Sequence, residues 1–138
     1  MATLAVETEI EAIHSALQSW IGSVEGRDVD RLAEIVSPDE SLVWIGAGAE
    51  DWLCGFKALE RAMVAQNDAF RDIQIQVSDE TIHWSSGEIS AWATNRWIFK
   101  ATVGDQSIAF PLRCTWILTK GETGWKIVHF HKSVGMVG

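Results

Sequence analysis

The chain has 138 residues and a formal net charge of −8, and its few basic side chains are scattered along the sequence. We therefore expect no nucleic-acid partner, which would need a basic surface, and no membrane span, because no apolar run approaches ~18 residues. The length and the 47% hydrophobic content predict one globular domain over residues 1–138.

The cysteine content and the start of the chain indicate a compartment. Glu7 follows Met1 too soon for a signal peptide, and no positively charged segment precedes it. Cys54 and Cys114 are the two cysteines, and we expect both to be reduced thiols in a cytoplasmic protein. Eight tryptophans without a tyrosine suit a deep pocket or a subunit contact, although indoles also fill ordinary cores.

Helical spacing dominates the first half of the chain. Apolar residues recur every three or four positions up to Val24, which predicts a helix that begins at Thr8 in a capping box with Glu11 and ends at Gly26. A short second helix is predicted after Asp28. Residues 41–46 and 50–54 then indicate a hairpin, and residues 56–70 a third helix.

The second half of the chain reads as strands. The predicted strands cover residues 72–84, 88–101, 106–119 and 124–133, separated by glycine-containing turns. Helices followed by long antiparallel strands predict an α+β fold with the helices on one face of a sheet. Both faces of the strands are substantially apolar, so we expect a homodimer through the outer face, with Trp92, Trp116 and Phe130 in the contact.

The last strand, residues 125–133, carries the first candidates for chemistry. Side chains alternate along a strand, so His129 and His131 are expected on one face with Trp125 and Ile127. Two imidazoles in a pocket could transfer protons at neutral pH. The alternative is that they are structural, one of them bonding a backbone carbonyl or a carboxylate. A metal site would need a third ligand such as Asp51 or Glu50, and the spacing is weak, so no metal or other cofactor is expected.

Further candidates come from the remaining polar and aromatic residues. Asp51 beside Trp52 is the candidate general base, with a solvated turn carboxylate as the alternative and Glu50 as its substitute. Arg113 either clamps an oxyanion or forms an internal salt bridge to Glu50 or Asp51. The candidate ligand-binding residues are Trp44, Trp52, Trp97, Gln66, Thr115 and His14.

Several segments spread over the chain share a pattern with a known family: Trp20, Gly26-Arg27-Asp28, Val43-Trp44-Ile45-Gly46, Glu50-Asp51-Trp52 with Gly55, Arg113-Cys114-Thr115 and residues 125–133. Together they resemble the nuclear transport factor 2-like superfamily, in particular its SnoaL-like branch of small bacterial proteins. The resemblance implies a cone-shaped α+β barrel, in which three N-terminal helices pack on a curved, mixed but mostly antiparallel sheet, with a pocket at the wide end and a homodimer.

The resemblance leaves the activity open. The superfamily includes ketosteroid isomerase, scytalone dehydratase and polyketide cyclases, which act next to a carbonyl, and also non-catalytic association domains. The first two rely on pocket tyrosines, which this chain lacks. Our first hypothesis is a small-molecule pocket protein with isomerase, dehydratase or cyclase chemistry by general acid–base catalysis. The second is a non-catalytic dimeric module that binds a ligand or serves as a scaffold.

Overall fold

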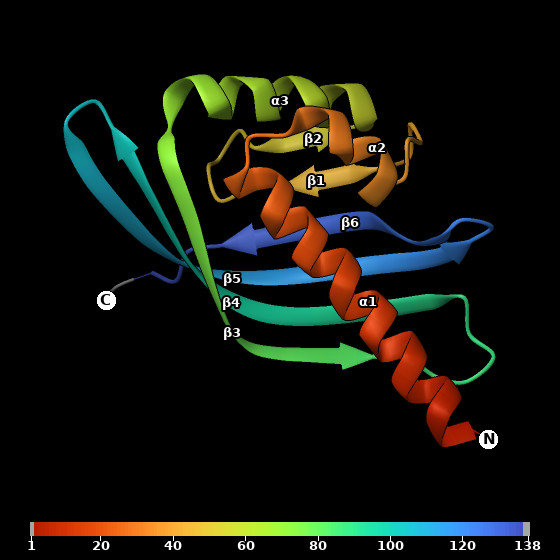
Figure 1. Cartoon of the computed structure of the whole chain (residues 1–138). Helices are drawn as coiled ribbons and strands as arrows, with labels where there is room; N and C mark the ends of the chain where they lie inside the picture. Colours follow the sequence, from red (N-terminus) through yellow and green to blue (C-terminus); the bar gives the residue numbers. More distant parts are fainter. Residues whose placement is uncertain (1, 137–138) are drawn as a thin grey trace.

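A six-stranded sheet with helices on one side forms the protein (Figure 1). The computed structural model describes residues 2–136. In chain order the elements are α1 (Ala2–Glu25), the 3-10 turn η1 (Val29–Arg31), α2 (Leu32–Ile35), β1 (Val43–Ile45), β2 (Trp52–Cys54), α3 (Phe56–Ala69), β3 (Arg71–His83), β4 (Ser90–Val103), β5 (Gln106–Gly121) and β6 (Gly124–Ser133). No helix among the described residues is long and apolar enough to cross a bilayer.

The strands are ordered β2-β1-β6-β5-β4-β3 in one mixed sheet. Only β1 and β6 run parallel, and all other neighbours are antiparallel. The predicted α+β class and the curved, mostly antiparallel sheet are thus confirmed. The sheet does not close into a barrel, because β2 and β3 are its two free edges. Figure 1 shows the β4–β5 hairpin curling away from the rest of the sheet.

Two bulges in β3 contribute to this curvature. The pairing of β3 with β4 shifts between Arg71 and Gln74 and again between Ser78 and Thr81. Within the two gaps Asp72 and Asp79 adopt positive φ values of 52° and 53°. Aspartate tolerates this left-handed conformation better than most residues, and an extra residue on one strand bends it and increases its twist.

Most predicted element boundaries agree with the structure within about two residues. The exception is the first helix, which begins at Ala2 rather than in a capping box at Thr8. Residues with high helix propensity, such as Ala2, Leu4 and Ala5, precede Thr8 and allow the helix to continue upstream. At its other end α1 stops before Gly26, as predicted.

Buried and exposed residues alternate along β4 and β5, so one face of the sheet is covered and the other is open to solvent. On β5 the inward residues Leu112, Cys114, Trp116 and Leu118 are buried, whereas the residues between them are exposed. Trp116 is therefore a core residue, as is Phe130 on β6, and the expectation that both lie in an outer dimer contact is wrong. Of that predicted trio, Trp92 alone is exposed on the outer face, at 49% of its surface.

An aromatic cluster fills the centre of the core. Phe130 contacts Trp116, Trp44 and Trp97, with ring centroids 4.2, 4.8 and 5.6 Å apart. Trp20 of α1 packs on Trp44 at 4.6 Å. Such pairs contribute about 0.5–1.5 kcal/mol each beyond the burial of their area. The cluster joins α1 to β1, β4, β5 and β6 and forms the base for the site described below.

A third bulge, in β6, decides which side chains of the last strand enter the core. Ile117 pairs with His129 and Leu118 with Ile127, so Val128 has no partner on β5. An extra residue reverses the phase of the side chains that follow it. Ile127 is buried before the bulge and Phe130 after it. At this point β6 exchanges neighbours, from a bridge between Ile127 and Val36 to parallel pairing with β1.

Candidate functional site

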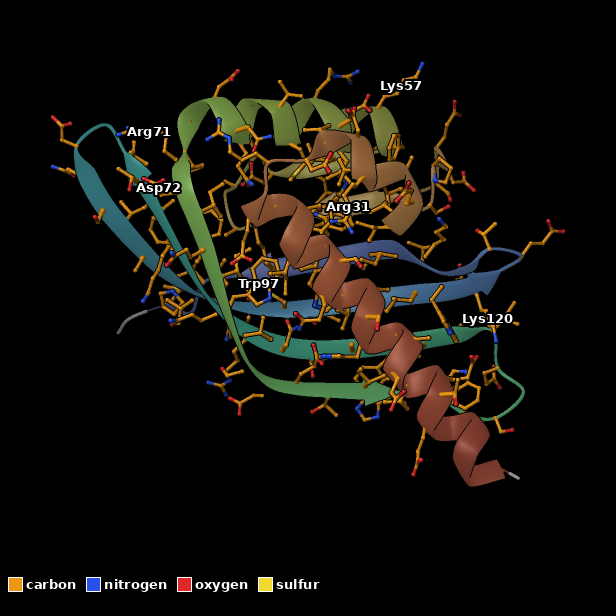
Figure 2. The ribbon with its side chains drawn as sticks, in the orientation of Figure 1. Arg31, Lys57, Arg71, Asp72, Trp97 and Lys120 are labelled. Carbon is orange, nitrogen blue, oxygen red and sulfur yellow. The ribbon has the colours of Figure 1, made fainter. Side chains whose placement is uncertain are left out.

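A cavity of about 580 Å³ lies between the inner face of the sheet and the helices α1 and α3. This volume is in the range of about 300–1,000 Å³ that is common for small-molecule sites. Its lining is mostly apolar and includes Trp20, Trp44, Trp97 and Phe130 of the aromatic cluster. Figure 2 shows Trp97 on the helix-covered side of the sheet. The indoles therefore line the cavity without filling it.

Lys132 is the cationic side chain of the cavity lining. It stands two residues after Phe130 on β6, and so on the same, inward face. Its Nζ lies 5.9 Å from the centroid of the Phe99 ring, within the distance of a cation–π contact. Although the residue keeps some exposed surface, desolvation by burial lowers the pKa of its amine below the ordinary 10.5.

The groups around Lys132 compensate its charge only weakly. The Asp51 carboxylate acts on it electrostatically and opposes the lowering of its pKa, but no ion pair within 4 Å joins Lys132 to a carboxylate among the described residues. The Cys114 thiol stays neutral, because burial raises its pKa to about 12. An amine in an apolar wall without a close counter-ion is unusual and marks a candidate functional group.

Asp51 supplies the carboxylate of the site, and the turn between β1 and β2 holds it. The Gly48 amide donates to Asp51 Oδ2 at 2.8 Å, and the Asp51 amide donates to the Gly48 carbonyl at 3.1 Å. A Cβ atom on Gly46 would lie 2.7 Å from Asp51 Cβ, and one on Gly48 2.6 Å from Oδ2. Both glycines therefore let the carboxylate lie close to the backbone. Asp51 is exposed, at the edge of the cavity lining.

Three unpartnered donors belong to residues of the same lining. The Nε1 groups of Trp20 and Trp97 and the Nε2 group of Gln66 are buried and have no hydrogen-bond acceptor among residues 2–136. Buried donors without acceptors cost about 1–3 kcal/mol each. A ligand that carries oxygen acceptors could satisfy some of them, so the site is suited to a flat apolar compound with polar oxygens.

The predicted site residues divide into two groups. Asp51, Trp44, Trp97 and Gln66 line the cavity, as expected. Trp52 does not, because 65% of its surface is exposed on the edge strand β2. Asp51 is therefore not desolvated by a neighbouring buried indole, and the alternative interpretation of an exposed turn carboxylate matches the structure.

The predicted histidines do not enter the cavity, so the expectation that both imidazoles face it is wrong. The bulge at Val128 turns His129 and His131 to the outer face, opposite Ile117 and Thr115 of β5. The carbonyl of Val43 is 2.8 Å from His129 Nδ1, which must carry a hydrogen because a carbonyl only accepts. His129 thus fastens β6 to β1, in agreement with the structural alternative. His131 is exposed.

Arg113 and Thr115 share the outer face with His131, because Thr115 pairs with His131 and Arg113 with Ser133 across β5 and β6. The expectation that Thr115 lines the cavity is therefore wrong. Arg113 and Thr115 line a separate, polar hollow of about 510 Å³ that also includes Ser133 and Arg96. Arg113 Nε donates to Ser133 Oγ at 3.1 Å, and Arg113 is exposed. It forms neither a clamp in the cavity nor the expected salt bridge to Glu50 or Asp51.

His14 also lies away from the cavity. It is exposed on α1 and pairs with the carboxylate of Glu80 on β3. Glu80 in turn accepts a hydrogen bond of 3.4 Å from the buried Asn95, whose Oδ1 accepts one of 3.1 Å from Trp116 Nε1. His14 therefore anchors α1 to the sheet, and its contacts give it no role in the cavity.

Lys132 is the site residue that the sequence analysis missed. A signal for it exists in the order of apolar residues on the last strand. Trp125 and Ile127 alternate with polar residues, Val128 follows Ile127 directly, and Phe130 then alternates in the opposite phase. Two adjacent apolar residues between two phases indicate a bulge. Read in this way, the strand places Phe130 and Lys132 inside.

Comparisons with known proteins agree with this architecture. A family model described as SnoaL-like domain matches residues 13–137. A nuclear transport factor 2-like superfamily protein from Salmonella enterica superposes with a TM-score of 0.86 at 19% identity, over 96% of each chain. A protein from Caulobacter vibrioides with a cystatin-like fold superposes with a TM-score of 0.78 at 18% identity, over 94% of this chain and 91% of the other.

A structure from Streptomyces avermitilis, described as a dehydratase of the nuclear transport factor 2-like family, has a TM-score of 0.84 at 15% identity, over 95% of this chain and 99% of that one. At such identities the similarity establishes a shared fold and carries no activity with it. No curated protein matches the sequence.

Proposed function

The chain belongs to the SnoaL-like domain family, and we propose that its cavity binds a small, largely apolar carbonyl compound and promotes proton transfer at the carbon next to the carbonyl. Lys132 activates the carbonyl group. Asp51, on the same lining, removes or returns the proton. Reactions of this class include the isomerisations, dehydrations and cyclisations that proceed through an enol or enolate.

One observation carries the proposal: an amine without a close counter-ion lies in an apolar cavity that also contains a carboxylate. Desolvation keeps the ammonium and neutral forms of Lys132 closer in free energy than in water. A group of this kind can act on a carbonyl at neutral pH, which an exposed lysine does poorly. The polar donors of Gln66 and the two indoles can bind oxygen atoms of the same ligand.

The proposal can be tested without knowledge of the natural substrate. The probe is α-tetralone, a bicyclic aromatic ketone, in D2O, and NMR measures the loss of its α-protons. We expect the wild type to accelerate exchange and Lys132→Met and Asp51→Asn to reduce it by at least about tenfold, the lower range for loss of an acid–base group. His131→Ala, on the outer face, serves as the matched control and should leave the rate unchanged.

Binding is measured separately by tryptophan fluorescence, because Trp20, Trp44 and Trp97 line the cavity. Quenching by α-tetralone with equal exchange in all four proteins would refute the acid–base role and favour a non-catalytic ligand-binding module. Absence of quenching as well would remove the cavity from the proposal.

For the outer face we propose contact with a second copy of the chain. The helices leave this face uncovered (Figure 1), and Trp92, Ile98 and Ile117 expose 49, 37 and 39% of their surfaces there. Trp92 and Ile117 are cross-strand neighbours, and Ile98 lies further along β4 on the same face. Exposed apolar residues on one sheet face are typical of interaction sites, and a two-fold contact would bury them on both protomers at once.

Analytical ultracentrifugation tests this contact. A dimer is expected for the wild type and a monomer for Ile117→Lys, which places a charge at the centre of the face. The exposed Val64→Lys change on α3 is the control and should remain dimeric. A monomeric wild type at all concentrations would contradict the proposed contact.

A further inference from the structure

We propose that Lys132 acts covalently: its neutral amine condenses with an aldehyde or ketone in the cavity to form an imine. The inference rests on the proposed function, because it uses the same cavity, and it specifies how the carbonyl group is activated. An ammonium ion would only donate a hydrogen bond to the carbonyl oxygen. An imine replaces that oxygen by nitrogen.

The first argument is the absence of a close carboxylate. A lysine that serves as a fixed cation is normally held by an anion within hydrogen-bond distance. Lys132 has no such ion pair and no hydrogen bond among the described residues. Its Nζ instead lies over the aromatic face of Phe99, 5.9 Å from the ring centroid. An amine in these surroundings loses its proton more readily than an exposed one and is then a nucleophile.

The second argument is the contrast with the other four lysines of the chain. The amine of Lys120 bonds Glu9 at 2.8 Å, and the amine of Lys126 bonds the Glu34 carbonyl. Lys57 is exposed on α3 (Figure 2) and is not part of the cavity lining. Lys100 lies on the outer face of β4, like Ile98. Among the five, Lys132 belongs to the cavity lining, where a bound carbonyl compound would meet it.

The condensation balances without any oxidant or reductant. The nitrogen lone pair of Lys132 forms a bond to the carbonyl carbon, and the C=O π pair moves to oxygen. Transfer of a proton from nitrogen to oxygen gives a carbinolamine. The hydroxyl takes a second proton and leaves as water while nitrogen forms the C=N bond. The donors of Gln66 and Trp97 are available to bind the departing oxygen, and the carboxylate of Asp51 can then take the α-proton, which the protonated imine acidifies.

The test is reductive trapping with β-naphthaldehyde and cyanoborohydride near neutral pH, followed by intact-mass measurement and peptide mapping. Trapping adds the mass of the aldehyde less one oxygen atom. Because the cavity binds the aldehyde beside Lys132 and a lowered pKa raises the fraction of free amine, we expect labelling of the Lys132 peptide to exceed that of every other lysine peptide several-fold. Lys132→Met should abolish the fast label, and Lys57→Met should retain it.

A matched ligand separates the two proposals. β-Naphthylmethanol has the same ring system and cannot form an imine, so it should quench tryptophan fluorescence and slow the labelling of Lys132. Quenching by the alcohol without preferential labelling of Lys132 would overturn the imine and leave the cavity as a binding site. Uniform labelling of all lysines that the alcohol does not affect, with no quenching, would overturn both.

Discussion

Replacement of Lys132 by methionine tests the cost of placing an amine in the cavity wall. Methionine keeps an unbranched apolar stem and removes the charge, so contacts with Phe99 and its neighbours are largely retained. Burial lowers the pKa of the Lys132 amine in the folded protein, which means that folding is opposed by desolvation of the ammonium ion. We therefore expect Lys132→Met to raise the free energy of unfolding at neutral pH.

The sign of the pH dependence follows from proton binding. Between the lowered pKa and the ordinary 10.5, the unfolded chain holds a proton on Lys132 that the folded chain has released. The free energy of unfolding of the wild type therefore rises with pH across this window. Below the window Lys132 is charged in the folded protein, and the full free energy of desolvating its ammonium ion opposes folding. The advantage of the Lys132→Met variant should be largest at low pH and should shrink as the pH approaches 10.5.

The stability difference between Lys132→Met and the wild type is proportional to the pKa shift of Lys132, because each unit of pKa corresponds to about 1.4 kcal/mol. A domain of this size changes its Tm by about 4 °C for each kcal/mol. Urea unfolding of both proteins between about pH 6 and pH 9 measures the difference directly. Burial raises the pKa of Cys114 from 9.0 to about 12, which lowers the stability of both proteins above pH 9.0. This contribution largely cancels in the difference between the wild type and the variant. A variant that is less stable than the wild type, by a margin independent of pH, would refute the reasoning.

Three further changes test the packing and the turn. Trp116→Ala should lower the free energy of unfolding by about 3–5 kcal/mol in urea titrations. Trp92→Ala should lower it by less than about 1 kcal/mol in the monomer. Equal losses would contradict the placement of Trp116 in the core and Trp92 on the outer face. Deletion of Val128 should turn the side chains that follow it to the opposite face, so the circular dichroism spectrum of this variant should be that of an unfolded protein. Val128→Ala is the control and should remain folded. A stably folded deletion variant would contradict the role of the bulge. Gly48→Ala should displace the carboxylate of Asp51, because the new Cβ would lie 2.6 Å from Asp51 Oδ2. The variant should therefore exchange the α-protons of α-tetralone more slowly, while its Tm falls by no more than about 5 °C. An unchanged exchange rate would exclude Asp51 from the proton transfer.

The sequence was sufficient for the helices and strands and for the alternation within each strand. Helical spacing in α1 and strict alternation along β4 and β5 are properties of a single element, and both agree with the structure. Along β5 the alternation of Thr115 with Cys114 and Trp116 separates two faces, but it does not say which face is inward: Trp116 was expected outside and Thr115 in the pocket, and the structure has them the other way round. Patterns of this kind need no knowledge of neighbouring strands.

In the last strand, β6, alternation along the sequence is not enough to predict which side chains face the core. Uniform alternation from Trp125 places His131 inside, and one unpaired residue, Val128, places Lys132 there instead. Pairing with β5 and the change of neighbour from Val36 to β1 locate this bulge, and both involve residues distant in the sequence. The two histidines, the most prominent polar pair of the chain, were therefore assigned to the wrong face, and the lysine of the cavity lining was overlooked.

The same limit applies to the turn before β2. The sequence identifies Asp51 as a carboxylate near the pocket, but not how it is held. Its position depends on Gly46 and Gly48, where added Cβ atoms would approach it within 2.7 and 2.6 Å. Trp52 beside it was expected to cover the carboxylate, yet it lies on an edge strand and faces solvent.

The bulge in β6 directs Lys132 into an apolar cavity, and an NMR titration of the lysine ε-methylene resonances can detect the effect of this burial on the amine. We expect one of the five lysines to titrate below 10.5, because burial lowers its pKa, and its resonance to be missing from the Lys132→Met spectrum. Five lysines that all titrate together near 10.5 would contradict this expectation.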